Sequence, residues 1–399
     1  MTENNLVKTT GAQSLAILLM TFCWFFEAPA LGSALGVFPL EYPDISKFEI
    51  QLAWMGPYVT AMIFSPIAGR LALKYEKKNI ALIGLATYFV FGTLPFFVHS
   101  FSAIIVLRLL TGIGVGLVMP IPNAYIYERY VGAKRNSMLG YTSAFSNGAT
   151  IIAAILSGYL VVWFGGSRGC FLLFILIGLI LLYCVFCLPK SISTATEEEI
   201  KAQEKKKTKM SELPKIVWLY MLFVVLLYIT FSFVSSNFSL YVIGNGWGDA
   251  AAAGWCLSAI SAGAIIGGLI YGPLLKATKK WFNLISLILF GIAYIMFILA
   301  NGIGLLAVGG VFAGVGSALI LPYWLGETAK KCNPEEASTA YGFVTGGINV
   351  GAILCPIVQA AIGGICGNSD LPLLSIITVV LLAVCAIIAI IKRNSYKEV

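Results

Sequence analysis

The feature that most constrains this chain is a succession of long apolar segments, separated from one another by only a few polar residues. An α-helix needs about 20 apolar residues to cross a bilayer core about 30 Å thick. A membrane β-strand needs only about 9–11 residues and alternates polar with apolar side chains, unlike these segments. The sequence therefore predicts an all-α membrane protein. Twelve segments can be distinguished, at residues 14–40, 51–73, 79–98, 102–127, 136–163, 169–189, 215–243, 250–275, 282–299, 303–327, 337–363 and 370–391.

The amino-acid composition supports the same assignment. Charged residues make up only 11% of the 399 residues, and the mean hydropathy is +0.90. An average soluble protein contains about 25% charged residues. A chain with so few charges cannot cover a soluble surface of this size. Soluble enzymes, nucleic-acid-binding proteins and secreted scaffolds are therefore excluded. We expect a lipid bilayer around the chain and no nucleic-acid partner.

One long polar segment divides the chain. Residues 190–214 contain clustered lysines and glutamates of both signs. This composition is typical of a flexible linker or a short surface helix, although a binding platform is an alternative. We therefore predict an N-terminal six-helix bundle over residues 1–189, a cytoplasmic linker over 190–214 and a C-terminal six-helix bundle over 215–399.

The positions of the basic residues predict the orientation of the spans. With twelve spans and a cytoplasmic N-terminus, 23 of the 26 Lys and Arg residues fall in cytoplasmic segments. Only Lys47 and Arg168 fall in outer loops, and Arg108 lies within a span. This asymmetry follows the positive-inside rule for membrane proteins. The sequence thus predicts a multi-pass protein of the cell membrane with both termini in the cytoplasm.

Processing and cofactor chemistry leave little trace in the sequence. Ala28-Pro29-Ala30 imitates a signal-peptidase site, but cleavage there would invert the charge pattern, so we expect none. The chain has nine cysteines, most of them within spans, and a single histidine, His99. We expect these residues to form no zinc or haem site. No glycine-rich phosphate-binding loop with a following Lys-Ser/Thr is present, so ATP is not expected as the energy source. We predict no metal site, no cofactor and no enzymatic activity.

The two halves of the sequence are related. Gly114–Gly116 and Pro122 match Gly314–Gly316 and Pro322 at a shift of 200 positions. Other pairs match at a shift of 202: Lys77-Lys78 with Lys279-Lys280, Gly140 with Gly342, and Asn147 with Asn349. A tandem repeat of six spans builds two bundles around an axis normal to the membrane. Such an arrangement favours a transporter that works by alternating access.

Two motifs resemble signatures of the major facilitator superfamily. The turn Gly69–Lys78 reads Gly-Arg-Leu-Ala-Leu-Lys-Tyr-Glu-Lys-Lys and is similar to the family's turn between spans two and three. Leu73 stands at the position of the family's Asp, and Glu76 stands at that of its second Gly. Arg108, followed by a helix rich in Gly-x-Gly, is similar to the span-four signature.

This resemblance covers essentially the whole chain and implies the twelve-helix fold of the family. It also implies that the span-four arginine takes part in proton coupling. The family's antiporter signature in span five, a Gly-Pro pair with a closing Gly-Gly, is absent from Gly148–Gly158. The absence weakens the case for an efflux antiporter.

Glu27 and Arg108 are the candidate coupling residues. They are the only acidic and basic residues deep within predicted spans, where ionisable groups are costly and typically functional. At a rise of about 1.5 Å per residue, Glu27 lies roughly 10 Å from the outer face and Arg108 about 9 Å from it. Their matching depths predict that they meet. A permanent structural ion pair is the alternative.

Two further groups of residues are candidates for the gate and the substrate cavity. Charged residues at the inner ends of the spans, together with the turn glycine Gly69, predict a cytoplasmic gate, with ordinary interfacial charge as the alternative. The charged residues are Lys74, Lys77, Lys78, Glu128, Arg129 and Glu327. Amides and aromatic residues within spans are candidates to line the cavity, although interface belts and core packing use aromatics too. These are Trp24, Trp54, Tyr58, Tyr125, Phe145, Asn147, Asn237, Tyr241, Trp255, Tyr323, Trp324 and Asn349.

These observations predict secondary active transport of a small organic solute by a monomer, with the proton as coupling ion. No cluster of basic residues exists for a phosphate or dicarboxylate, so a neutral, weakly cationic or singly anionic solute fits best. Uptake by symport and export by antiport both remain open. An uncoupled facilitator and a lipid flippase are alternatives. A membrane sensor is a third, but it would need a sizeable soluble output domain.

Overall fold

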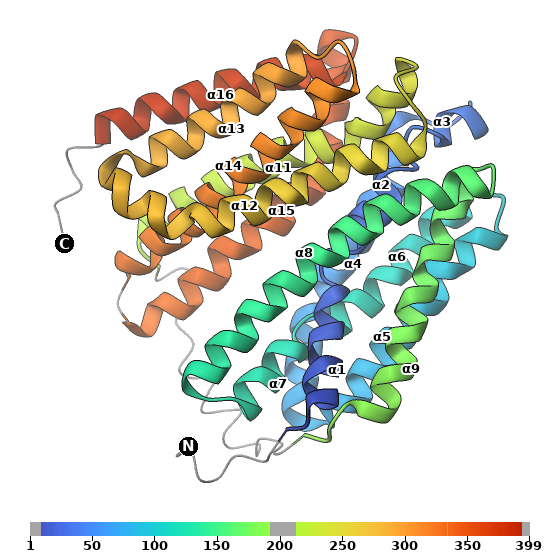
Figure 1. Ribbon diagram of the computed structural model, residues 1–399, viewed down its shortest axis with the longest axis vertical. Coiled ribbons are helices and arrows are strands. Elements are labelled where there is room, and N and C mark those ends of the chain that lie inside the picture. Colours follow the sequence, from blue (N-terminus) through green and yellow to red (C-terminus); the bar gives the residue numbers. More distant parts are fainter. Residues whose placement is uncertain (1–8, 192–212, 333, 393–399) are drawn as a thin grey trace. The chain divides into compact units, whose positions relative to one another are not determined.

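The computed structural model describes residues 9–191, 213–332 and 334–392, and every regular element among them is a helix. The chain divides into two compact units (Figure 1). The first contains Met1–Ala34 and Phe38–Lys206, and the second contains Leu35–Val37 and Lys207–Val399. The division between 206 and 207 falls within the polar segment 190–214, most of which lies outside the described residues.

The N-terminal unit consists of eleven described helical elements. Helix α6 packs against α4 on one side and α5 on the other, and α8 packs against α1 and α2. The elements are α1 (Gly11–Phe22), α2 (Glu27–Gly32), α3 (Phe38–Glu41), α4 (Lys47–Lys74), α5 (Lys77–Thr93), η2 (Leu94–Phe97), α6 (Phe101–Val118), α7 (Ile121–Arg129), α8 (Gly132–Trp163), η3 (Ser167–Phe174) and α9 (Ile175–Cys187).

The C-terminal unit repeats this packing with longer, less interrupted helices. Helix α14 packs against α12 and α13, as α6 does against α4 and α5, and α11 packs against α15. Its described elements are α11 (Lys215–Gly244), α12 (Ala250–Thr278), η5 (Lys279–Trp281), α13 (Phe282–Ile298), α14 (Ile303–Lys330), α15 (Pro334–Cys366) and α16 (Leu371–Lys392).

The predicted all-α membrane fold is confirmed. Among the described residues, eight helical stretches are long and apolar enough to cross a membrane, and one of them, Ala250–Ile298, contains two of the predicted spans. Gly11–Phe22 and Leu371–Ile387 are shorter apolar helices. The total of twelve spans therefore stays a prediction.

The first predicted span is not one continuous helix. The segment 14–40 is broken into α1, α2 and α3, with turns at residues 23–26 and 33–37. Pro29 explains the first break, because proline has no N–H and its ring clashes with the carbonyl four residues earlier. That carbonyl belongs to Phe25, and the Thr150 hydroxyl of α8 donates to it at 3.4 Å. A hydroxyl on a neighbouring helix thus replaces the missing backbone donor.

Other hydroxyls of α8 hold the same broken span. Ser146 donates to the carbonyl of Thr21 at 3.1 Å, and Ser157 donates to the carbonyl of Ala30. The Ser33 hydroxyl donates to Ser157 at 2.7 Å. Because interhelical hydrogen bonds satisfy backbone groups that lipid cannot, this row of contacts makes the break tolerable within an apolar bundle.

Glycines set the close approach of the central helices in both units. A Cβ on Gly112 would lie 2.0 Å from the carbonyl oxygen of Pro57 in α4, and one on Gly314 would lie 1.9 Å from that of Ile260 in α12. In the same way, Gly114 abuts the backbone of Tyr88 in α5, and Gly316 abuts that of Phe290 in α13. These packing partners are all related by shifts close to 202, so the structure corrects the shift of 200 that the Gly-x-Gly motifs suggested.

Candidate functional site

A buried ion pair lies in the middle of the N-terminal unit. Glu27, the first residue of α2, contacts Arg108 of α6 through Oε1 and Nη1. The side chains are only 1% and 0% exposed, respectively. The break in span one sets the position of Glu27, because α2 begins directly after the turn that Pro29 imposes. The predicted meeting of the two residues is therefore seen in the structure.

The surroundings of Arg108 fix its guanidinium group. Its Nε donates to the carbonyl of Ala53 in α4 at 3.0 Å. Its Cζ lies 5.8 Å from the centroid of the Phe174 ring, a distance suited to a cation–π contact. The Phe174 ring in turn meets Phe26 and Tyr88 edge to face, at 5.7 and 5.6 Å. The pair is thus enclosed by aromatic side chains and shielded from solvent.

Several polar atoms around the pair lack hydrogen-bond partners within the described part of the chain. They include Glu27 Oε2 and Arg108 Nη2. Unpartnered buried polar groups cost free energy and are rare in folded proteins. Such a cluster can change its proton content or its partners when the surrounding helices move. Among the ion pairs of the described residues, this is the one in which both side chains are about 1% exposed or less.

A second charged cluster lies where α5 begins and α7 ends. Lys77 Nζ lies 2.8 Å from Glu128 Oε2, and both side chains are about one-tenth exposed. This contact joins two of the predicted gate residues. Helix α5, with 17 residues and a length of about 25 Å, separates this cluster from the opposite end of the unit.

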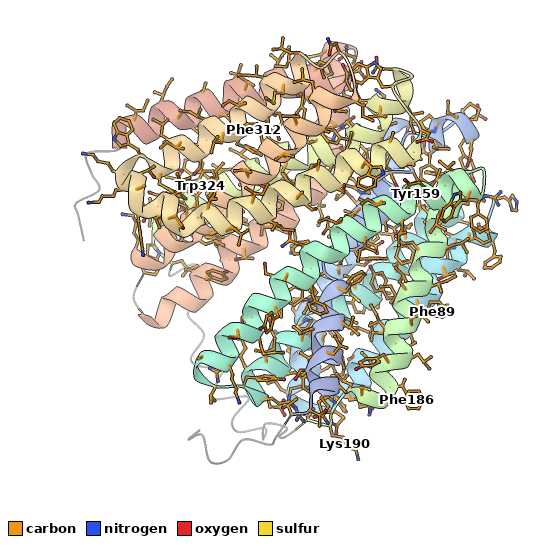
Figure 2. The ribbon with its side chains drawn as sticks, in the orientation of Figure 1. Phe89, Tyr159, Phe186, Lys190, Phe312 and Trp324 are labelled. Atoms are coloured by element: carbon orange, nitrogen blue, oxygen red, sulfur yellow. The ribbon has the colours of Figure 1, made fainter. Side chains whose placement is uncertain are left out.

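The same cluster holds the segment that follows α9. The Tyr125 hydroxyl donates to the carbonyl of Pro189 at 2.7 Å, and Arg129 Nη2 donates to that of Lys190. Ser191 N–H donates to Glu76 Oε1 at 2.6 Å. Figure 2 marks Phe186 and Lys190 at this end of the unit. The start of the polar segment 190–214 is therefore anchored to the N-terminal unit rather than free.

Comparison with known proteins decides the family. A sequence profile described as Major Facilitator Superfamily matches residues 12–249 and 220–398, which together cover nearly the whole chain. The chain belongs to the major facilitator superfamily. The quinolone resistance protein NorA of Staphylococcus aureus (strain N315) is 25% identical over 301 residues, 72% of this chain and 74% of NorA. The protein is accordingly a multi-pass membrane transporter and not an enzyme.

Solved structures of other transporters have the same fold. The nucleoside transporter NupG superposes with a TM-score of 0.73 at 14% identity, covering 97% of this chain and 100% of NupG. A D-xylose–proton symporter superposes with a TM-score of 0.71 at 12% identity, covering 93% of this chain and 96% of the symporter. At these identities the similarity extends to the major facilitator fold and not to the substrate.

The candidate substrate-binding residues in the N-terminal half differ in how far they are buried. Trp54 and Tyr125 are 1% and 0% exposed, and both donate hydrogen bonds within their own unit. Trp54 Nε1 reaches the carbonyl of Ala28 at 2.9 Å and so ties α4 to α2. The others, which are partly exposed, are Trp24, Tyr58, Phe145 and Asn147.

In the C-terminal half, Trp324 is buried and its Nε1 donates to Asn283 Oδ1 at 3.1 Å. Trp255 is 54% exposed. The partly exposed candidates are Tyr241, Tyr323 and Asn349. A role in substrate binding stays a prediction for all twelve residues.

Asn237 belongs to a buried amide network in the C-terminal unit. Its Nδ2 donates to Gln359 Oε1 at 3.0 Å, and Gln359 Nε2 donates to the Ser236 hydroxyl at 2.9 Å. Both amide side chains are at most 3% exposed. Because Asn237 donates to Gln359 and Gln359 donates to Ser236, the network joins α11 to α15 and gives these buried amides hydrogen-bond partners.

Residues outside the predicted sets complete both clusters. Tyr88 and Phe174 surround the ion pair, but nothing distinguishes either from the chain's other 17 tyrosines or 24 phenylalanines. Glu76 could have been identified from the sequence, because it replaces a glycine of the family motif.

Two of the remaining gate candidates differ in their surroundings. Glu327 is 7% exposed in α14, and Gly69 has open space around its Cα.

Proposed function

We propose that this transporter couples the movement of a small organic solute to protons through the Glu27–Arg108 pair. The observation that carries the proposal is a buried carboxylate whose cationic partner sits on a different helix. A carboxylate that loses such a partner in an apolar environment takes up a proton, because an uncompensated buried charge is costly. A change in the separation of α2 and α6 would therefore bind or release a proton.

The geometry of span one supports this role. Glu27 is carried by the six-residue helix α2, which is separated from α1 by a turn. Arg108 is held by Ala53 of α4 and by the long helix α6. A short segment attached through side-chain hydroxyls can shift against a fixed helix with few backbone bonds broken. We propose Glu27 as the proton carrier and Arg108 as the group that tunes it.

The proposed substrate is neutral, weakly cationic or singly anionic, and contains an apolar body. The name of NorA associates that relative with quinolone resistance, which favours a drug-like compound and export. The two units would move this substrate across the cell membrane by alternating access. On this proposal the Lys77–Glu128 contact and the other predicted gate residues close the cytoplasmic side.

Transport in proteoliposomes tests the coupling. A thermal-stability screen with quinolones, nucleosides and sugars first selects a ligand, because binding to the folded state raises its melting temperature. Uptake of that ligand is then measured with and without an imposed pH gradient. Glu27→Gln should abolish the gradient-driven component and retain exchange of labelled for unlabelled ligand. The direction of accumulation relative to the gradient distinguishes symport from antiport.

The matched control is Glu49→Gln, at a partly exposed glutamate in the first turn of α4, where glutamine can keep the capping contact with Ser46. It should retain both gradient-driven uptake and exchange. Full gradient-driven uptake by the Glu27→Gln protein would refute the coupling role. Equal rates with and without a gradient in the wild-type protein would instead identify a facilitator.

A further inference from the structure

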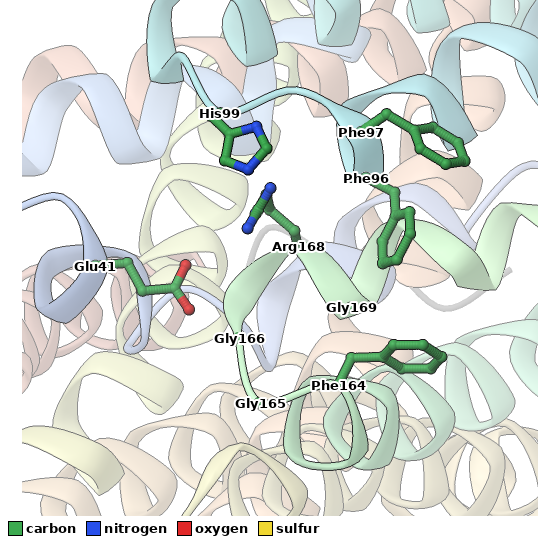
Figure 3. Close-up of a pocket in the computed structure, with 9 residues that line it drawn as sticks. All are labelled: Glu41, Phe96, Phe97, His99, Phe164, Gly165, Gly166, Arg168 and Gly169. Carbon is green, nitrogen blue, oxygen red and sulfur yellow. The ribbon is translucent and has the colours of Figure 1, made fainter.

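A cavity at the outer end of the N-terminal unit is not part of the site described above. It has a volume of about 350 Å³, within the usual range for small-molecule sites. Three separate connections form it: the end of α3, the turn after η2, and the turn between α8 and η3. The lining residues are Glu41, Phe96, Phe97, His99, Phe164, Gly165, Gly166, Arg168 and Gly169 (Figure 3).

The polar wall of this outer pocket carries a cation without an anionic partner. Both oxygens of Glu41 accept hydrogen bonds from Ser167, one from its backbone N–H at 2.6 Å and one from its hydroxyl. Within the described part of the chain, no carboxylate forms an ion pair with Arg168. Figure 3 shows the Arg168 guanidinium beside the His99 ring. The acidic residue is thus engaged in shaping the loop, while the two basic side chains face the cavity.

The opposite wall is aromatic. The Phe96 and Phe164 rings meet edge to face at 5.7 Å, and Phe96 meets Phe97 at 5.1 Å. Phe97 and Phe164 are 67% and 55% exposed, respectively. Gly165, with a φ of +64°, and Gly166, where a Cβ would lie 2.8 Å from Glu41 Oε1, let the backbone form the floor between the two walls. The pocket thus presents apolar ring faces on one wall and the Arg168 guanidinium on the other.

We propose that this outer pocket binds an organic oxyanion, a carboxylate or phosphate attached to an apolar body. Arg168 presents a planar set of N–H donors that matches both anions bidentately, and His99 adds a second donor. Two sources share this chemistry: a water-soluble aromatic acid and the phosphate of an anionic lipid headgroup. The proposal is independent of the proton-coupling role of Glu27, because the two sites share no residue.

Equilibrium dialysis of 2-naphthoate against the purified full-length protein tests the proposal, with 2-naphthol as the uncharged counterpart. Wild-type protein should bind 2-naphthoate and discriminate at least tenfold against 2-naphthol. Arg168→Gln should weaken 2-naphthoate binding about tenfold or more, and Phe164→Ala should weaken it several-fold. Arg70→Gln, at an exposed arginine on α4, is the matched control and should leave binding unchanged.

A second comparison identifies the source of the anion. The dialysis is repeated in nanodiscs of phosphatidylcholine with and without phosphatidylglycerol. Displacement of 2-naphthoate by phosphatidylglycerol in wild-type protein identifies a lipid headgroup, and unchanged binding identifies a soluble anion. Either result supports an oxyanion site when Arg168→Gln removes the binding. Absence of 2-naphthoate binding in both nanodiscs and detergent, or equal binding by wild type and Arg168→Gln, would overturn the proposal.

Discussion

The Glu27–Arg108 pair shows how single residues define the centre of the N-terminal unit. Two opposite charges buried together cost much of their attraction in lost hydration, so such a pair adds little net stability compared with apolar side chains. Removing one partner is far more costly, because the other charge is left uncompensated. On the proposed coupling role, the pair is retained for the proton that its charges bind and release rather than for stability.

A double-mutant cycle at this pair tests that account. Arg108→Gln should lower the free energy of unfolding by about 3–5 kcal/mol, because Glu27 is left buried without a cation. The double variant Glu27→Gln plus Arg108→Gln should recover much of this loss. Denaturant unfolding in detergent measures both, with Arg70→Gln as an exposed control expected within about 0.5 kcal/mol of wild type. A double variant with the summed loss of the two single variants would contradict the account.

At the scale of single residues, the sequence predicted the pair but not its setting. Glu27 and Arg108 stood out because charges are rare in apolar spans, and their depths matched. The roles of Phe174, Tyr88 and the Ala53 carbonyl depend on which faces of α4, α5 and η3 meet. Those faces are set by packing between helices of similar hydrophobicity, which carries little periodic signal in the sequence.

At the scale of helices, the continuity of span one was the main error. Its length and apolarity predicted one helix over 14–40, whereas Pro29 breaks it and α8 supplies hydroxyls to the freed backbone. The proline was visible in the sequence. Its compensation by Thr150 and Ser146 was not, because those donors lie more than 120 residues away along the chain.

The glycine contacts between helices give a prediction at this scale. Gly112→Ala should destabilise the protein by about 1–3 kcal/mol or more, because its Cβ would lie 2.0 Å from the Pro57 carbonyl oxygen and the backbone of α4 would have to move. Gly314→Ala should behave alike, since its Cβ would lie 1.9 Å from the Ile260 carbonyl oxygen. Thermal unfolding in detergent, followed by tryptophan fluorescence, measures the loss.

Gly148→Ala is the matched control for both glycine variants. This residue also lies within a helix, but a Cβ there would meet no atom within 4 Å. Alanine should be neutral or stabilising by up to about 1 kcal/mol, because it is the better helix former. Equal melting temperatures for Gly112→Ala and Gly148→Ala would show that the contacts between α4 and α6 are looser than the structure describes.

At the scale of the whole molecule, the tandem repeat was predicted and its register was refined. The sequence motifs suggested shifts of both 200 and 202 positions between the two halves. Gly114 packs on Tyr88 as Gly316 packs on Phe290, and this correspondence selects the shift of 202. At this shift Pro120 corresponds to Pro322. Repeated Gly-x-Gly motifs can be aligned at more than one offset, so only the helices they contact decide between the offsets.

The orientation of the whole chain in the membrane gives the last prediction. Helix α4 spans 28 residues, about 42 Å, which is long enough to cross the bilayer, although it is not among the eight described stretches that are also apolar enough. It separates the exposed Asp44, in a loop that contains only one basic residue, from the basic turns at its other end. Those turns include the exposed Ala133 region, with Lys134 and Arg135. The positive-inside rule therefore places Ala133 in the cytoplasm and Asp44 outside.

In a cysteine-free background, an impermeant maleimide should label Asp44→Cys on intact cells and should label Ala133→Cys only after permeabilisation. Labelling of Ala133→Cys on intact cells, with Asp44→Cys protected, would invert the topology.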